Sequence, residues 1–207
     1  MQFMSIEVAT RSFLFVPPER VLSFDELDEY IRARRQGVRT AQTEVPFFHN
    51  HLHDLESLWW VAVWVVFYNY FSEGTSSRDR PSFTLQDAED QLNLACILFP
   101  PFLDSITRQL GFQYAESFRV TCDQLPGNKR VICGGLDLLR RLLISHYTVI
   151  EAGHPQSVDP SSSKDDIYVH FTRLFSTLKT VSRDLVLDFI PEIYEKLVLE
   201  GEDSKYE

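Results

Sequence analysis

The sequence predicts a mainly α-helical protein whose helices pack around one central, buried hydrophobic helix. The strongest observation is the run Leu58–Tyr68, in which every side chain is apolar or aromatic. Such a run is shorter than the roughly 20 residues needed to cross a bilayer, and it is too long for an ordinary strand. A helix that is apolar on all sides belongs in a core with other elements around it. Apolar residues also recur at helical spacing from Leu136 to Ile150, which predicts a second long helix.

Two acidic residues, Asp54 and Glu56, stand at the start of the central run. Negative charge stabilises the positive end of a helix dipole, and an aspartate accepts hydrogen bonds from the free N–H groups of a first turn. We therefore expect Asp54 to cap the central helix, with residues 38–53 forming the loop that leads into it.

The other elements are placed by capping residues and helix breakers. Ser23 and Glu26 have capping-box spacing and open an amphipathic helix that Gly37 ends. Gly111 is expected to end a short helix, and residues 112–132, with a Pro-Gly-Asn turn signal, to form a hairpin or irregular segment. A short helix or turn is expected at residues 5–14, and further helices at about 84–98, 102–110, 136–150, 164–185 and 187–199, the last with Pro191 in its first turn.

Size, charge and cysteine content narrow the classes of function. A chain of 207 residues is long enough for one domain with a real core. The net charge of −10 argues against nucleic acid or an anionic membrane as the main partner. Cys96, Cys122 and Cys133 are odd in number and unevenly spaced, and no secretory signal is visible, so we expect an intracellular protein, cytoplasmic or nuclear.

Two segments of the chain resemble parts of a protein kinase. Asp54-Leu55-Glu56-Ser57, continued by Leu58, resembles the start of the long buried helix in the kinase C-terminal lobe. Phe3-Met4-Ser5-Ile6-Glu7 resembles the end of the activation segment, usually Met-Ala-Pro-Glu. Together the two segments are similar to the fungal-type protein kinase family, through about Phe71. The resemblance implies a partial kinase-like C-terminal lobe over residues 1–199, with loop insertions at about 38–53, 72–83 and 154–163, and a charged tail at 200–207.

The resemblance also implies roles at the matching positions. Asp54 corresponds to the aspartate that holds the backbone of the kinase catalytic loop. Glu7 corresponds to the glutamate that pairs with a buried arginine later in the lobe. The sequence departs from the family at Ile6, where proline is usual, and at Trp59, where many kinases have glycine. The arginines open to pairing with Glu7 are Arg140, Arg141, Arg173 and Arg183.

The ATP-binding and catalytic motifs of the family are absent from the sequence. Phosphoryl transfer needs a glycine-rich loop, a strand lysine, a catalytic-loop aspartate with its asparagine, and a metal-binding aspartate. The chain has no Gly-x-Gly, His-Arg-Asp or Asp-Phe-Gly, and Asp188-Phe189-Ile190 is only a chance similarity to the last. In a kinase these parts precede the stretch that residues 2–7 resemble, so we expect the chain to begin inside the activation segment.

The expected function is therefore that of a catalytically inert, kinase-like fragment, of pseudokinase type, without sites for ATP or Mg and with at most a protein partner. The alternative is the C-terminal part of an active Ser/Thr kinase whose N-terminal half lies outside this chain. A third interpretation is an unrelated helical adaptor.

A metal site, a catalytic cysteine and a phosphate site are weaker alternatives. His49, His51 and His53 alternate, so in an extended segment they would share one face near Asp54, although a loop of partly exposed histidines is the simpler interpretation. Cys96 is expected on an apolar helix face, where a thiol contributes packing rather than chemistry. The arginines at 32, 34 and 35 are expected at a solvated helix end, with phosphate recognition as the alternative, and the tryptophans at 59, 60 and 64 in the core.

Overall fold

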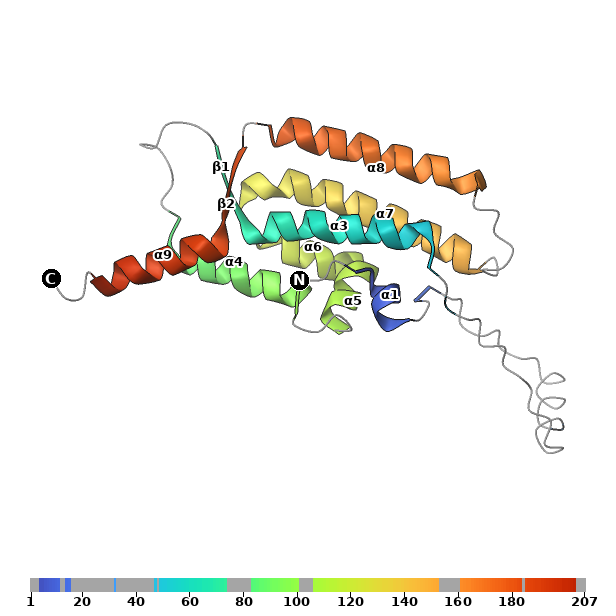
Figure 1. The fold of residues 1–207 in the computed structure, drawn as a ribbon, viewed down its shortest axis with the longest axis horizontal. Helices are drawn as coiled ribbons and strands as arrows, with labels where there is room; N and C mark the ends of the chain where they lie inside the picture. Colours follow the sequence, from blue (N-terminus) through green and yellow to red (C-terminus); the bar gives the residue numbers. More distant parts are fainter. Residues whose placement is uncertain are drawn as a thin grey trace.

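The computed structural model of the protein describes residues 4–11, 14–15, 32, 47, 49–73, 83–100, 106–152, 161–183 and 185–203. In this part of the chain the fold is mainly helical, as predicted. Helix α3 (His51–Tyr68) lies in the middle, with α8 on the outside of one face and α4, α5 and α6 toward the other (Figure 1). Helix α7 (Arg130–Ala152) packs along α3.

The central helix is confirmed, but it is not buried on every side. Trp59, Trp60 and Val63 are completely buried in the core. On the opposite face, Leu58 is 54% exposed and Val61 is 38% exposed. The all-apolar run therefore forms a core helix with one open face.

Trp59 finds its neighbours in three other helices. Its ring packs against Phe112 and Phe118, and its indole N–H donates a hydrogen bond to the Leu136 carbonyl oxygen at 2.8 Å. A buried tryptophan N–H needs such a partner. Trp59 is thus a packing centre that joins α3 to α7.

The remaining helices have the following bounds: α1 (Ile6–Thr10), α4 (Leu85–Leu98), α5 (Ile106–Gln113), α6 (Ala115–Asp123), α8 (Ser161–Val181) and α9 (Ile190–Asp203). Helix α4 begins as predicted, because the Thr84 hydroxyl accepts from the Asp87 N–H and the Asp87 carboxylate accepts from the Thr84 N–H. A short 3₁₀ turn, η1 (Gly127–Lys129), leads into α7.

Two short strands were not predicted. Strand β1 (Asn69–Glu73) continues directly from α3, and β2 (Leu185–Phe189) precedes α9. They pair antiparallel, with Asn69 opposite Phe189 and Glu73 opposite Leu185. The predictions of a loop from residue 72, of helix through residue 185 and of helix from residue 187 were therefore wrong at these positions.

The segment around residues 106–132 also differs from the prediction. Residues 115–123 form helix α6 rather than a hairpin or irregular chain. Gly111 lies inside α5 instead of ending it, and a Cβ there would come within 2.7 Å of the Leu98 Cδ2 atom. This glycine is needed for close packing of α5 on α4 rather than for a left-handed backbone.

Several predictions cannot be compared with the structure. The helix opened by Ser23 and ended by Gly37 lies outside the described residues, as do most of the loops at 38–53 and 72–83. Of the predicted linker, residues 161–163 belong to α8 and the rest is not described. The tail predicted from residue 200 is helical to Asp203.

Candidate functional site

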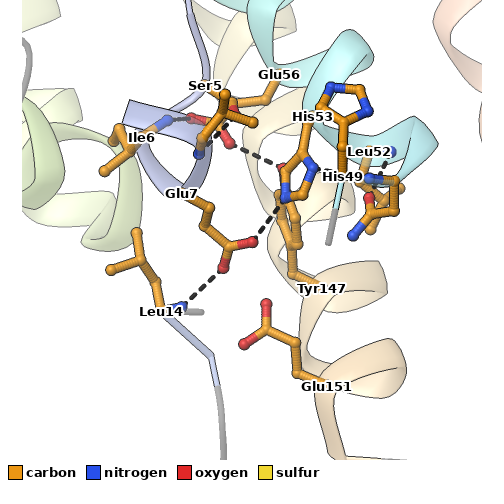
Figure 2. Close-up of polar contacts among 12 residues, drawn as sticks. Ser5, Ile6, Glu7, Leu14, His49, Leu52, His53, Glu56, Tyr147 and Glu151 are labelled. Carbon is orange, nitrogen blue, oxygen red and sulfur yellow. Dashed lines mark hydrogen bonds and ion pairs between the residues drawn. The ribbon is translucent and has the colours of Figure 1, made fainter. Parts of the chain in front are cut away.

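The N-terminal segment is held on the first turns of α3 by buried hydrogen bonds (Figure 2). Ser5 is the N-cap of α1, where its hydroxyl accepts from the Val8 N–H at 3.3 Å. The next N–H, that of Ile6, donates to Oε1 of Glu56 at 2.8 Å. The structure thus brings together the two segments that the sequence singled out, and both Ser5 and Ile6 are buried.

Glu56 is completely buried and accepts hydrogen bonds from three separate elements. Besides the Ile6 N–H, the indole N–H of Trp60 donates to Oε1 at 3.1 Å, and the hydroxyl of Tyr147 donates to Oε2 at 2.9 Å. Burial raises the pKa of the Glu56 carboxyl, and these three donors oppose that rise. One side chain therefore connects α1, α3 and α7.

Glu7 pairs with His53 in the same buried region. The Nε2 atom of His53 lies 2.8 Å from Oε2 of Glu7, and the Leu14 N–H donates to Oε1 of Glu7 at 2.7 Å. Burial raises the pKa of Glu7 to about 7 and lowers that of His53 to about 4. His53 is therefore neutral at physiological pH.

The position of the proton on His53 follows from its other ring nitrogen. Nδ1 lies 2.9 Å from the backbone nitrogen of Asn50 and accepts its N–H. In a neutral imidazole one nitrogen accepts and the other carries the proton. Nε2 therefore carries the proton, and its N–H donates a hydrogen bond to the Glu7 carboxyl.

Glu151, on α7, is the third carboxyl in this region. Its Oε2 accepts from the Phe15 N–H at 2.7 Å, while its buried Oε1 has no hydrogen-bond partner among the described residues. Figure 2 shows the Glu151 carboxyl facing that of Glu7. Burial, with the adjoining Glu7 carboxyl, raises the pKa of Glu151 to about 9, so this acid keeps its proton at neutral pH.

We refer to Glu7, His53, Glu56, Tyr147 and Glu151 as the carboxylate–histidine cluster. Each of them is at most 3% exposed, so the cluster does not face solvent. A buried charged group without a partner costs free energy. In this cluster that cost is lowered because the carboxyls accept hydrogen bonds and Glu151 keeps its proton. The arrangement of the cluster joins the N-terminal segment to α3 and α7.

The predicted arginine partner of Glu7 was wrong. The guanidinium of Arg140 binds Asp137 and the Phe112 carbonyl oxygen, and Arg141 also binds Asp137. Arg173 and Arg183 are exposed. In place of an arginine, Glu7 pairs with His53, a histidine of α3 itself.

A different arginine reaches the N-terminal segment. Arg108, in α5, is 2% exposed, donates to the Met4 carbonyl oxygen at 2.6 Å and lies 4.4 Å from the centre of a Trp60 ring. Burial lowers its pKa to about 10, so it remains charged at neutral pH. Nothing in the sequence pattern distinguishes it from the exposed arginines.

The predicted cap of α3 was also wrong. The N-cap is Asn50, whose side-chain oxygen accepts from the Leu52 N–H at 2.8 Å. The Asn50 N–H in turn donates to Nδ1 of His53. The Asp54 side chain is 70% exposed and lies 3.5 Å from the His49 imidazole. It does not hold a buried backbone in this part of the chain. Of the other motif residues, Leu55 is buried and the Ser57 hydroxyl donates to the His53 carbonyl oxygen.

The three histidines do not share one face of an extended segment. His51 and His53 lie in the first turn of α3, and both ring nitrogens of His53 are occupied by Asn50 and Glu7. His49 is half exposed. Within the described ranges, no group of three or more histidine, cysteine or acidic side chains is arranged to hold a metal ion.

The three cysteines differ in burial, and Cys96 is not buried as expected. Cys96 is exposed on α4, whereas Cys122 and Cys133 are buried where α6 meets α7. All three are free thiols. The prediction that Cys96 packs on an apolar helix face was therefore wrong.

Tyr147 and Glu151 are the cluster residues that the sequence did not single out. They are four residues apart, which places both on one face of a helix. That spacing was visible, but Tyr147 fitted the apolar stripe of its helix, and Glu151 followed the expected end at Ile150. A carboxylate on the apolar face of a long helix was the available signal.

None of the described helices is both long and apolar enough to span a bilayer. No protein-family model, curated protein or solved structure matches the chain.

Proposed function

We propose that the chain is the helical part of a kinase-like C-terminal lobe that binds a protein partner and does not itself transfer phosphate. The observation that carries this proposal is the buried hydrogen bond from the Ile6 N–H to Glu56, which are 50 residues apart. It joins the segment that resembles the end of an activation segment to the head of the helix that resembles the central kinase helix. This contact supports the proposal because it places the two segments that carry the resemblance side by side, although the contacts of Glu7 and Asp54 themselves differ from those that the resemblance implies.

The absence of phosphotransfer is supported by the sequence motifs and by the burial of the cluster. Without a glycine-rich loop and a metal-binding aspartate, the chain has no recognisable means to hold Mg-ATP. Among the described residues, the carboxyls of the carboxylate–histidine cluster are buried and do not face solvent. A binding role then falls to the exposed apolar side chains, such as Leu58 and Leu138.

The test is a measurement of Mg-ATP binding and phosphate turnover by the purified chain. We expect no saturable binding by calorimetry and no transfer of labelled phosphate to protein substrates, with an active Ser/Thr kinase as the positive control. Saturable Mg-ATP binding together with turnover would refute the proposal.

The second candidate is the C-terminal part of an active Ser/Thr kinase, and the same motif pair favours it, because those motifs follow the catalytic residues in a kinase. The reading frame upstream of residue 1 decides between the two. An in-frame glycine-rich loop, strand lysine and His-Arg-Asp motif would establish the kinase.

A further inference from the structure

An open groove with a volume of about 550 Å³ lies between α7 and α8, away from the carboxylate–histidine cluster. Its walls combine leucines with basic side chains. We call it the α7–α8 groove and define it by Leu138, Arg141 and Leu142 of α7 and by His170, Arg173 and Leu174 of α8.

The spacing of the lining residues suits a third helix. On α7 the lining runs from Leu138 to Ser145, and on α8 from His170 to Thr177. Each stretch spans two helical turns, or about 10 Å. An amphipathic helix with apolar side chains at positions i, i+4 and i+7 presents them over the same length, so it fits between these two stretches.

The apolar part of the groove is open to solvent. Leu138 is 60% exposed, although it is a large aliphatic side chain in the middle of a long helix. Leu142 and Leu174 are partly buried against the core beneath it. Burying such side chains in a partner is favourable in proportion to the apolar area removed from water.

The charge of the groove is opposite to that of the whole chain. Arg140 and Arg141 share one carboxylate, that of Asp137, so this group keeps a net positive charge. Arg173 and His170 lie across the groove, and among the described residues no acidic side chain lines it. The chain as a whole carries a net charge of −10. A basic groove on an acidic protein selects an acidic partner.

We infer that the α7–α8 groove binds an acidic amphipathic helix of another protein. The apolar side chains of the partner helix lie between Leu138 and Leu174, and the carboxylates of that helix pair with Arg141 and Arg173. This inference rests on the proposed protein-binding function and names the class of partner.

The test uses two labelled helical peptides with leucine at positions i, i+4 and i+7, one flanked by glutamate and the other by lysine at the same positions. We expect the intact chain to prefer the glutamate peptide by about tenfold or more in fluorescence anisotropy, and the preference to shrink with added salt. Arg173→Glu is expected to reduce or reverse the preference, and Arg141→Gln to weaken it while Asp137 still holds Arg140.

Matched controls separate the groove from general surface effects. Arg119→Glu changes an exposed arginine of α6, and Val149→Asn changes a 69% exposed valine of α7 outside the groove; both should bind like the wild type. Leu138→Asn should weaken the glutamate peptide. Circular dichroism checks that every variant keeps its helical content.

Three results would overturn the inference: equal binding of both peptides, no binding of either, or groove variants that bind like the controls. Self-association of the chain that Leu138→Asn abolishes would also overturn it, because a second copy would then occupy the groove. Phosphate turnover is measured separately. Failed peptide binding without turnover therefore removes this inference alone, whereas turnover removes the proposed absence of phosphotransfer.

Discussion

At the scale of single residues, the Glu56 carboxylate is the point where three parts of the chain meet. It accepts hydrogen bonds from the Ile6 backbone, the Trp60 indole and the Tyr147 hydroxyl, and it is completely buried. A buried donor that loses its acceptor costs more than the bond contributed, because water does not replace the partner. All three donors therefore depend on this one side chain.

Glu56→Gln tests that dependence. An amide keeps one acceptor oxygen but turns the other acceptor into a donor, which then faces a donor. We expect the free energy of unfolding to fall by about 1–3 kcal/mol in urea denaturation. Glu116→Gln, at an exposed carboxylate that pairs with Arg119, is the control and should change it by no more than about 0.5 kcal/mol. Equal effects of the two substitutions would contradict the role given to Glu56.

The sequence predicted that Glu7 and Glu56 matter but not what they contact. Glu7 was assigned an arginine because the family resemblance implies one. Its actual partner, His53, is 46 residues away, and no local periodicity encodes a pairing at that separation. Arg108 was missed for the same reason, since burial of a charged residue is decided by tertiary packing rather than by its neighbours in sequence.

At the scale of elements, the start of α3 shows how a cap is chosen. Asn50 and His53 exchange hydrogen bonds in a capping box, with histidine where glutamate or glutamine is usual. Because the histidine obscured the pattern, the acidic Asp54 appeared to be the better cap. The same bond that closes the box fixes the tautomer of His53, so the helix start and the Glu7 pair depend on each other.

Asn50→Ala and Asp54→Ala form a matched pair that tests this assignment. Loss of the Asn50 side chain removes the acceptor for the Leu52 N–H, and we expect a decrease of about 1 kcal/mol in the free energy of unfolding. Asp54 is exposed and supplies only favourable charge near the helix start, so its substitution should cost about 0.5 kcal/mol. If Asp54→Ala lowered the free energy of unfolding more than Asn50→Ala, Asp54 rather than Asn50 would be the cap.

Elements with a strong local signal were predicted well. The central apolar run, the helix expected at about 84–98 and the long stripe of α7 each depend on neighbours three or four residues apart. Strands β1 and β2 were missed because their pairing joins residues more than 110 positions apart, as in the Asn69–Phe189 pair. The turn signal at Pro126 did mark a break, but between two helices.

At the scale of the whole molecule, the docking of the N-terminal segment depends on a proton. The Phe15 N–H binds Glu151, and the Glu151 carboxyl faces Glu7. Burial raises the pKa of Glu151 from 4.5 to about 9, so the folded protein keeps a proton that the unfolded chain has already released. Stability from this group is complete below its unfolded pKa and is lost as the pH rises through about 9.

Glu151→Gln removes this dependence on pH, because an amide keeps an acceptor for Phe15 and a permanent donor toward Glu7. Above pH 6.5, the ordinary pKa of histidine, His53 is neutral in both states. We expect the variant to gain stability relative to the wild type from there to pH 9, by up to about 1.4 kcal/mol per pH unit. Urea denaturation at several pH values measures the difference.

The difference between the two proteins removes the contribution of groups that titrate in the same range but do not contact Glu151. Glu7, which faces Glu151 and has a pKa of about 7, stays part of the measured difference. Burial lowers the pKa of Lys129 to about 7, which makes stability rise with pH, but it does so equally in both proteins. Glu89→Gln, at an exposed acid of α4, should give a constant difference from the wild type. A constant difference for Glu151→Gln as well would show that Glu151 is ionised in the folded protein at neutral pH.

The contacts of Glu56 have a consequence for the order of events on the ribosome. Its first donor, Ile6, is synthesised before it, but Tyr147 follows 91 residues later. While α7 is still inside the exit tunnel, residues 5–7 have only part of their binding surface. These residues therefore reach their final position only after α7 has been translated, and a fragment that stops before Tyr147 is expected to leave them undocked.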